Sequence, residues 1–213
     1  MKHIDFYLDF ISPYAYLAFE QLPKALDGLS CSVAYKPILF GAVLKQHGQL
    51  GPAEIPTKRE WTYRQVLWLG HVHGIPIEMP AAHPFNPLAH LRLALATSPD
   101  GNISRYVAET VFREVWRGGQ EATDAARLAA LAERLELRRE PGSDAVKAQL
   151  KANTDEALSR GAFGVPAYAV DGRLIWGFDS LVMLRAALLD DPWFDGPQWH
   201  GAANRPSLQR GQR

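Results

Sequence analysis

Two short segments near the start of the chain alternate between apolar and polar positions. From His3 to Asp9, an apolar residue at every second position predicts a strand. The same period of two returns from Cys31 to Ile38. The segment between them has helical spacing and begins with Ser12 and Pro13, two residue types that favour a helix start. We therefore expect a β-α-β unit with parallel strands and a right-handed connection.

The middle of the chain changes to a helical pattern. Between Gly41 and Arg160, apolar residues recur three or four positions apart in several segments. The connector from Gly74 to Pro87 contains four prolines, so it should form a long ordered or functional loop. The predicted helices cover residues 59–73, 104–116, 124–137 and 143–160.

The C-terminal part returns to strand patterning. Segments 167–170 and 173–176 flank an Asp-Gly pair, which favours a tight type I′ hairpin turn. A last helix should begin at Asp179, whose side chain is suited to capping, and should end near Leu189.

This order of elements is typical of one α/β architecture. Strand, helix, strand, a helical block, a hairpin and a final helix match a thioredoxin-like fold with a large all-helical insertion. We assign residues 1–40 and 161–195 to a discontinuous thioredoxin-like domain and residues 41–160 to the insertion. Residues 196–213 lack periodicity and lean basic, and we expect them to form a disordered tail.

The composition excludes several classes of partner. The 213 residues include 23 lysines and arginines and 23 aspartates and glutamates, so no net field attracts nucleic acid or acidic membranes. No segment reaches the roughly 18 apolar residues of a membrane helix, and the first residues lack the pattern of a secretory signal. We expect a cytoplasmic protein without nucleic-acid or membrane partners.

The residue types and motifs also exclude several kinds of chemistry. The single cysteine, Cys31, lies in an apolar segment and cannot form an internal disulfide. His71 and His73 would face different sides of a helix, and the other histidines lie in separate contexts, so no metal site is expected. Motifs for dinucleotide, nucleotide and esterase chemistry do not occur in the sequence.

Ser12 is the first candidate for chemistry. The stretch Ser12-Pro13-Tyr14-Ala15 has the shape of a Cys-Pro-Tyr-Cys redox motif with both sulfurs missing, which excludes thiol–disulfide exchange. Two roles are open for this serine. It can serve only as a helix cap, or its hydroxyl can also meet a ligand at the positive end of the helix.

A second segment could face this helix end. Val165 and Pro166 directly precede the first strand of the hairpin. If the bond between them is cis, the Val165 backbone turns outward beside Ser12 and can pair with an extended peptide. Alternatively, Pro166 only begins an edge strand.

Asp179 and Lys58 are further candidates. Asp179 can cap its helix and also bind an ammonium group. Lys58, taken alone, is typical of a solvated surface residue.

Five short motifs occur in register, at residues 9–14, 41–45, 74–76, 162–166 and 176–179. Together they resemble the 2-hydroxychromene-2-carboxylate isomerase family. That family is similar to kappa-class glutathione transferases and to disulfide oxidoreductases of the DsbA group. The likeness extends from about Lys2 to Leu189, and the combination of motifs is specific, although each motif alone is weak.

The resemblance implies glutathione as the cofactor and assigns residues to its site. The sulfur of glutathione would face Ser12, the catalytic residue. The backbone of Val165, before Pro166, would pair with the cysteinyl part. Asp179 would meet the glutamyl end, and Lys58 would approach the glycine carboxylate.

Several positions depart from the family pattern. Gln49 and Ser180 belong to the implied glutathione site, at positions where the family commonly has asparagine and arginine, and Trp68 replaces another common arginine. Tyr14 and Asn86 are implied to contact the second substrate. These changes keep the implied glutathione site but alter the polar groups around it. The resemblance also implies a homodimer.

A serine at a helix start could activate a bound thiol. A cysteine thiol has a pKa near 8.5. A helix N-terminus contributes about 0.3 to 1 kcal/mol, up to about 2 when partly buried, and a hydrogen bond to a charged group contributes about 1.5 to 3. Together they could lower the pKa of the thiol by roughly two units, which makes it largely thiolate at neutral pH.

Three functions are compatible with this chemistry. The first is a glutathione-dependent cis-trans isomerase, whose thiolate adds to a small aromatic or conjugated substrate, permits rotation about the former double bond and leaves again. The second is a kappa-type glutathione transferase, which would conjugate the thiol irreversibly. The third is a thioredoxin-fold binding module without catalysis.

Overall fold

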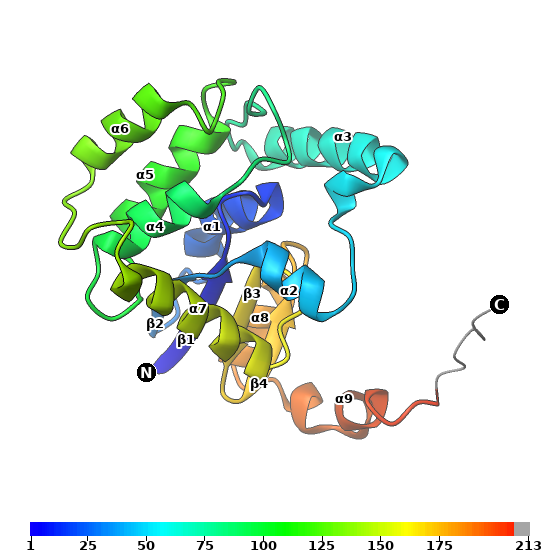
Figure 1. Ribbon diagram of the computed structural model, residues 1–213. Helices are drawn as coiled ribbons and strands as arrows, with labels where there is room; N and C mark the ends of the chain where they lie inside the picture. The colour runs from blue at the N-terminus through cyan, green and yellow to red at the C-terminus, as the bar shows by residue number, and fades with distance from the viewer. Residues whose placement is uncertain (207–213) are drawn as a thin grey trace.

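The computed structural model of the protein describes residues 1–206 and contains a four-stranded sheet (Figure 1). Strand β1 pairs with β2 in parallel, whereas β3 runs antiparallel to both β1 and β4. The predicted β-α-β pairing and the predicted hairpin are therefore confirmed. The strands are, in the order in which they lie across the sheet, β2 (Cys31–Pro37), β1 (Lys2–Leu8), β3 (Ala167–Val170) and β4 (Arg173–Trp176).

The turn between β3 and β4 has the backbone that its sequence predicts. Asp171 and Gly172 have φ values of 49° and 74°. A type I′ turn requires positive φ at both central residues, and an Asp-Gly pair tolerates it.

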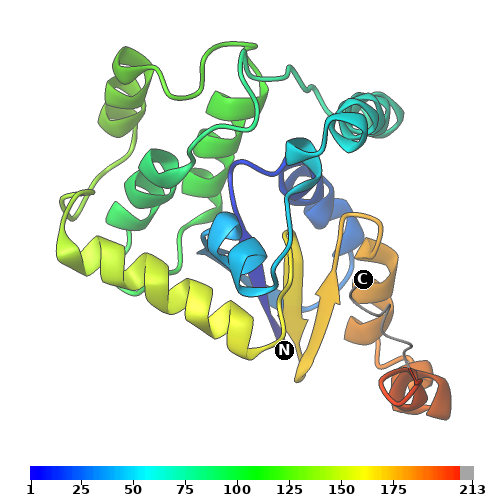
Figure 2. The same ribbon diagram turned by 45° about the vertical axis from the view of Figure 1, so that its right-hand side comes forward.

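Alternate residues of β1 enter two separate cores. Phe6 lies in the larger core, together with residues of α1 (Pro13–Ala25) and α8 (Leu181–Leu188). Tyr7, which points to the other side of the sheet, lies in a smaller core with residues of α7 (Asp144–Ser159). Figure 2 shows the sheet between α7, in yellow-green, and α8, in orange. The sheet therefore has helices on both faces, as a thioredoxin-like fold requires.

The segment between β2 and β3 is helical, as predicted. It shares the larger core with the sheet, because Phe112 of the insertion packs against Phe19 of α1 with ring centroids 5.3 Å apart. Its helices are α2 (Phe40–Gln46), the 3-10 helix η1 (Pro52–Glu54), α3 (Pro56–His73), α4 (Leu88–Ala96), α5 (Arg105–Trp116), α6 (Ala125–Arg134) and α7.

Two of these α-helices are not predicted by the sequence pattern. Helix α4 is buried on almost every side from His90 to Ala96, so it has no amphipathic period to detect. Helix α2 has only seven residues, which is too short for a period of 3.6 to stand out. The long connector from Gly74 to Pro87 is a loop, as expected, and leads directly into α4.

The start of α8 corrects one sequence-based prediction. Ser180, and not Asp179, is the N-cap residue, and no side chain makes a capping hydrogen bond there. The Ser180 hydroxyl instead donates to the carbonyl of Gly177 at 2.8 Å. The Asp179 carboxylate is therefore not used to satisfy the amides of this helix.

The segment after α8 is more regular than expected. It contains η2 (Pro192–Asp195) and α9 (Pro197–Ala202), although we expected a disordered tail from residue 196. The reason is aromatic packing, because the Trp199 ring contacts Trp193 and Phe194 with centroids 5.8 and 5.2 Å apart. Residues 207–213 of the expected tail lie outside the described residues.

Some features are absent from the described part of the chain. Within residues 1–206, every helix is too short or too polar to cross a bilayer. The same residues contain no group of three or more histidine, cysteine, aspartate or glutamate side chains that could hold a metal ion. Cys31 is half-buried in β2 and is a free thiol.

Candidate active site

Ser12 lies at the N-terminus of α1, as predicted. Its backbone is extended, with φ −89° and ψ 115°, and its hydroxyl oxygen accepts a hydrogen bond from the N–H of Ala15 at 3.2 Å. Pro13 occupies the first helical position, where an N–H would have no partner in the helix. Within residues 1–206 the Ser12 hydroxyl donates to no group, so its proton remains available to a ligand.

The buried carboxylate of Asp9 fixes the loop that carries Ser12. Its Oδ1 accepts from the N–H of Ile11 at 3.2 Å and its Oδ2 from the N–H of Phe40 at 2.9 Å. The Asp9 carbonyl accepts from the N–H of Ser12 at 3.1 Å. Burial raises the pKa of this carboxyl to about 7, although hydrogen bonds from backbone amides oppose the shift. The sequence analysis gave Asp9 no role, because Phe40 is distant along the chain.

Two side chains from the insertion hold the carbonyl groups that precede the helix. Trp116 donates its Nε1–H to the carbonyl of Phe10 at 2.9 Å, and Nε2 of His83 lies 2.8 Å from the carbonyl of Ile11. The other ring nitrogen of His83 lies 2.9 Å from the hydroxyl of Tyr63. Burial lowers the pKa of His83, so a neutral ring donates from Nε2 to the carbonyl. The insertion therefore helps to position the loop that carries Ser12.

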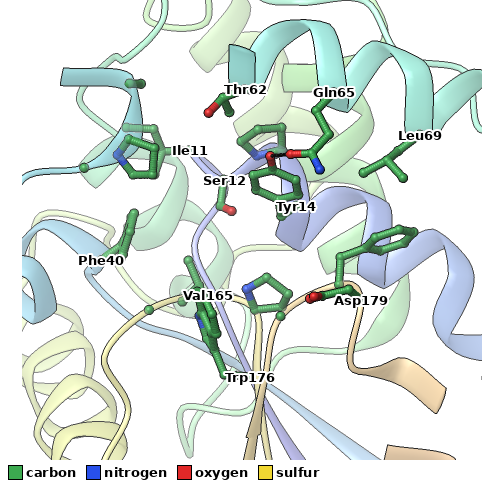
Figure 3. A pocket seen from close by; sticks show the side chains of 18 of the residues that line it. Ile11, Ser12, Tyr14, Phe40, Thr62, Gln65, Leu69, Val165, Trp176 and Asp179 are labelled. Carbon is green, nitrogen blue, oxygen red and sulfur yellow. Dashed lines mark hydrogen bonds between the residues drawn. The ribbon is translucent and has the colours of Figure 1, made fainter. Parts of the chain in front are cut away.

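The peptide bond between Val165 and Pro166 is cis, an isomer that the sequence left open. Within residues 1–206 the N–H and C=O of Val165 make no backbone hydrogen bond, whereas the carbonyl of Pro166 accepts from Gly177 at 3.0 Å. Figure 3 shows Val165 across the cavity from Ser12. Its backbone groups are therefore available to an extended ligand beside the start of α1.

A cavity of about 1310 Å³ opens between these two loops. Most of the residues that the sequence analysis assigned to the site line this cavity. They are Ser12, Tyr14, Gln49, Lys58, Val165, Pro166 and Asp179.

Two of the assigned residues lie elsewhere. Asn86 is exposed, and its Oδ1 accepts from the N–H of Leu88 at 3.1 Å, so it stabilises the turn before α4. Ser180 is the N-cap of α8, and its hydroxyl donates a hydrogen bond to the Gly177 carbonyl. Neither residue lines the cavity.

One acidic and one basic side chain that the sequence analysis assigned to the site line the cavity without pairing. The Asp179 carboxylate and the Lys58 ammonium group are both exposed, and within residues 1–206 neither forms a salt bridge. Gly177 allows the approach of Asp179, since a Cβ on this glycine, at φ 105°, would lie 2.5 Å from Oδ1 of Asp179. Gln49 adds an exposed amide. The cavity can therefore bind a ligand that carries both an ammonium group and a carboxylate.

One face of α3 supplies cavity residues that the sequence analysis missed. Residues three or four apart share a face of a helix, so the spacing from Lys58 was a signal that could have found them. One of them is Gln65, whose Oε1 accepts a hydrogen bond from the Tyr14 hydroxyl at 2.7 Å. The cavity residues on this face are Lys58, Thr62, Gln65, Leu69 and His73.

Trp68, which replaces a common arginine of the family, lies outside this cavity. Its side chain is 61% exposed on α3, and its ring contacts that of His71 with centroids 5.7 Å apart. This departure therefore changes the outer surface of α3 and leaves the cavity lining unaltered.

The protein is of the thioredoxin-fold class. Its sheet has the strand order β2-β1-β3-β4, it carries a helical insertion, and the N-terminus of α1 faces a cis-proline loop. The chain belongs to the family of DSBA-like thioredoxin domains, whose sequence profile matches residues 3–189. Both the fold class and the family that the sequence motifs resemble are thereby confirmed.

Relatives with known names fall into two groups. The chain is 30% identical over 195 residues to a 2-hydroxychromene-2-carboxylate isomerase from Pseudomonas putida. The matched region covers 87% of this chain and 93% of the relative. It is 24% identical over 214 residues to glutathione S-transferase kappa 1 from Rattus norvegicus, covering 91% and 93%. A solved 2-hydroxychromene-2-carboxylate isomerase has the same fold, with a TM-score of 0.74 at 24% identity over 96% of this chain and 100% of that one.

Proposed function

We propose that the protein is a glutathione-dependent cis-trans isomerase that acts on a small conjugated or aromatic compound. The observation that carries this proposal is the relation of Ser12 to Val165. In one cavity, the Ser12 hydroxyl at the N-terminus of α1 faces the backbone of Val165; among residues 1–206, the hydroxyl proton has no acceptor and the Val165 N–H and C=O have no backbone partner. The names of the relatives, isomerases and glutathione transferases, support this class of activity.

The chemical groups of glutathione match those of the cavity. The extended cysteinyl part would pair with the free backbone groups of Val165, as a peptide adds to a strand edge. The ammonium group at the glutamyl end of glutathione would meet the exposed carboxylate of Asp179. Its glycine carboxylate would meet Lys58 and Gln49, which lie on the insertion side of the same cavity.

Ser12 would stabilise the ionised thiol. Its free proton can be donated to a thiolate, and the helix end adds a positive potential, which together lower a thiol pKa by roughly two units from about 8.5. No lysine or histidine base is needed for this ionisation. Bound glutathione would supply the thiolate that adds reversibly to a conjugated carbon and so permits rotation about the bond.

A kappa-type glutathione transferase is the second candidate, because one of the two groups of relatives carries that name. It would use the same thiolate and the same residues, but glutathione would remain in the product. A non-catalytic binding module is the third candidate, motivated by the missing cysteines at Ser12 and Ala15.

A titration with glutathione, followed by the ultraviolet absorbance of the thiolate, tests the proposal. We expect binding below millimolar concentration and a thiolate band that Ser12→Ala removes and Ser12→Thr keeps. Absence of binding at millimolar glutathione would contradict it. An unchanged total of free glutathione after many turnovers identifies an isomerase, whereas stoichiometric loss identifies a transferase. A thiolate band that Ser12→Ala abolishes counts against the non-catalytic binding module.

A cytoplasmic location and a homodimer are part of the same proposal. The cytoplasm keeps glutathione reduced, which this chemistry requires. Fractionation of cells and sedimentation of the purified protein test these two statements.

A further inference from the structure

The cavity has a second end that the proposed glutathione contacts do not use. Beyond Asp179 it continues between the C-terminus of α1 and the first turns of α8, and Figure 3 shows α1 running from Ser12 past Asp179. We call this part the far end of the cavity. The residues that line it are Lys24, Ala25, Leu181, Val182 and Arg185. The whole cavity, about 1310 Å³, exceeds the roughly 300 to 1,000 Å³ that is typical of a site for one small molecule.

The far end is too distant from Ser12 for glutathione to fill. Lys24 follows Ser12 by twelve residues along α1, and a helix rises about 1.5 Å per residue, so their backbones are about 18 Å apart. An extended peptide of three residues spans about 11 Å, and the γ-linkage of glutathione adds little to that. The sulfur belongs to the middle residue. When it lies at Ser12, the far end therefore stays open to another ligand group.

The far end is basic. The lysines and arginines that line the cavity within residues 1–206 are Lys24, Lys58 and Arg185, whereas Arg59 and Arg64 of α3 lie outside it. The proposed function assigns Lys58 to glutathione, which leaves two cations at the far end. Neither forms a salt bridge with a carboxylate of residues 1–206. The C-terminus of α1 carries only about half a negative charge, so it does not neutralise them.

The Arg185 guanidinium is fixed and still has donors to offer. Its Nη1 donates to the carbonyls of Ala25 and Asp27, both at 2.8 Å, which holds the half-buried side chain against the end of α1. Among residues 1–206, Nε and Nη2 donate to no group, so capping of α1 does not account for them. Asp27 is exposed and does not line the cavity. A fixed guanidinium beside the Lys24 ammonium group suits a phosphate, which has more acceptors and more charge than a carboxylate.

The part of the cavity between Ser12 and the far end suits an arm that contains both amide and alkyl groups. The N–H and C=O of Val165 have no backbone partner within residues 1–206, so they can pair with an amide beside Ser12. Farther along, Leu181 and Val182 present apolar surface, and Val182 is 81% exposed. Alkyl groups of a ligand would remove this surface from water.

We infer that the cavity also binds a thiol on a phosphopantetheine arm, as in coenzyme A, with the sulfur at Ser12 and the phosphate between Lys24 and Arg185. The inference rests on the proposed function in one respect, the place of a thiol at Ser12. About thirteen bonds separate the sulfur of this arm from its first phosphorus, which corresponds to about 15 Å when the arm is extended. The lysine side chain bridges the rest of the distance along α1. The two amides and the alkyl segments of the arm match the lining described above.

Calorimetric titration with 4′-phosphopantetheine and pantetheine tests the phosphate site, because these thiols differ only in the phosphate. At low ionic strength we expect the phosphorylated thiol to bind wild type about tenfold more tightly, with a difference that shrinks as salt is added. Lys24→Met and Arg185→Met should each weaken its binding about fivefold to tenfold, and should leave pantetheine and glutathione unaffected. Coenzyme A should respond to both substitutions as 4′-phosphopantetheine does.

Lys45→Met is the matched control. Lys45 is exposed on α2 and does not line the cavity, so its loss lowers the net charge alone and should leave every Kd unchanged. Arg185→Met also takes the donor from the carbonyls of Ala25 and Asp27. Lys24→Met, at an exposed side chain, makes the same test without that loss.

The position of the sulfur is tested by the thiolate absorbance of bound 4′-phosphopantetheine. We expect a band in wild type that Ser12→Ala removes. Absence of the band, or a band unchanged in Ser12→Ala, would overturn the inference.

Three binding results would also overturn it. They are equal affinity for the two pantetheines, an unchanged Kd for 4′-phosphopantetheine in Lys24→Met and Arg185→Met, and an equal weakening of glutathione in these variants. Binding of 4′-phosphopantetheine without binding of glutathione would refute the proposed function and keep this inference. The reverse result would refute this inference alone.

Discussion

The backbone N–H of Phe40 donates to the buried carboxylate of Asp9 at 2.9 Å, which joins the start of α2 to the loop that carries Ser12. Asp9 has no exposed surface, and desolvation raises its pKa from 3.8 to about 7. Between these two values the folded protein binds more protons at this site than the unfolded chain. The contribution of Asp9 to stability is therefore greatest in acid and is lost as the pH rises toward 7.

We expect Asp9→Asn to remove this dependence on pH. The free energy of unfolding of wild type, relative to that of the variant, should fall by up to about 1.4 kcal/mol per pH unit between about pH 4 and 7. Denaturant unfolding at several pH values measures it. Asp155→Asn, which changes an exposed carboxylate on α7, is the control and should show no such trend. A constant difference between wild type and Asp9→Asn would contradict the expectation.

Gly164→Ala should damage the loop that carries Val165. A Cβ at this position would lie 2.6 Å from Nε1 and 3.3 Å from Cε2 of Trp176, so the indole or the loop must move. We expect a loss of about 1 to 3 kcal/mol in stability and weaker glutathione binding. Thermal unfolding and calorimetric titration measure the two effects.

Gly41→Ala is the matched control for that substitution. Gly41 is in α2, and among residues 1–206 a Cβ at this position would meet no atom within 4 Å beyond its chain neighbours and the backbone of its own helix. Its stability should rise by about 0.5 to 1 kcal/mol, because alanine favours a helix. Similar losses in both variants would show that the contact with Trp176 is not the cause.

Lys58→Met tests the proposed contact with the glycine carboxylate. Lys58 is exposed, so we expect the Kd for glutathione to increase only about twofold to fivefold, with a smaller effect at high salt. The monoethyl ester of that carboxylate should bind wild type and the variant equally. Lys151→Met, on α7, is the control. Equal weakening of the acid and the ester would assign Lys58 a different role.

Trp116→Phe should affect both stability and the site. The side chain is fully buried, and its loss leaves the Phe10 carbonyl without its donor. We expect the free energy of unfolding to fall by about 2 to 4 kcal/mol and glutathione to bind more weakly. Trp61→Phe, at a side chain that is 64% exposed on α3, should change stability by less than about 0.5 kcal/mol.

The parts of the site that the sequence predicts are those with a local cause. Ser12 caps α1 because serine before proline favours a helix start, and residues 167–176 form a hairpin because an Asp-Gly pair favours its turn. These signals depend on residues only a few positions apart. Val165 was found in the same way, from its place before Pro166.

The parts that the sequence does not predict depend on distant contacts. The hydrogen bond between Asp9 and Phe40, and that between His83 and Ile11, join residues that only the folded chain brings together. Asp179 was assigned a capping role because its residue type fits, but the turn at Gly177 makes Ser180 the N-cap instead. Local propensity cannot distinguish adjacent residues that are both suited to a cap.

Trp116 and His83 also limit how far this protein can be treated as exchangeable modules. Both residues belong to the segment between β2 and β3, and both hold carbonyl groups just before Ser12. A minimal domain made of residues 1–40 and 161–195 would leave those carbonyls to solvent. Transplanting the insertion from a relative would therefore also alter the loop that carries Ser12, unless donors at these two positions were carried across with it.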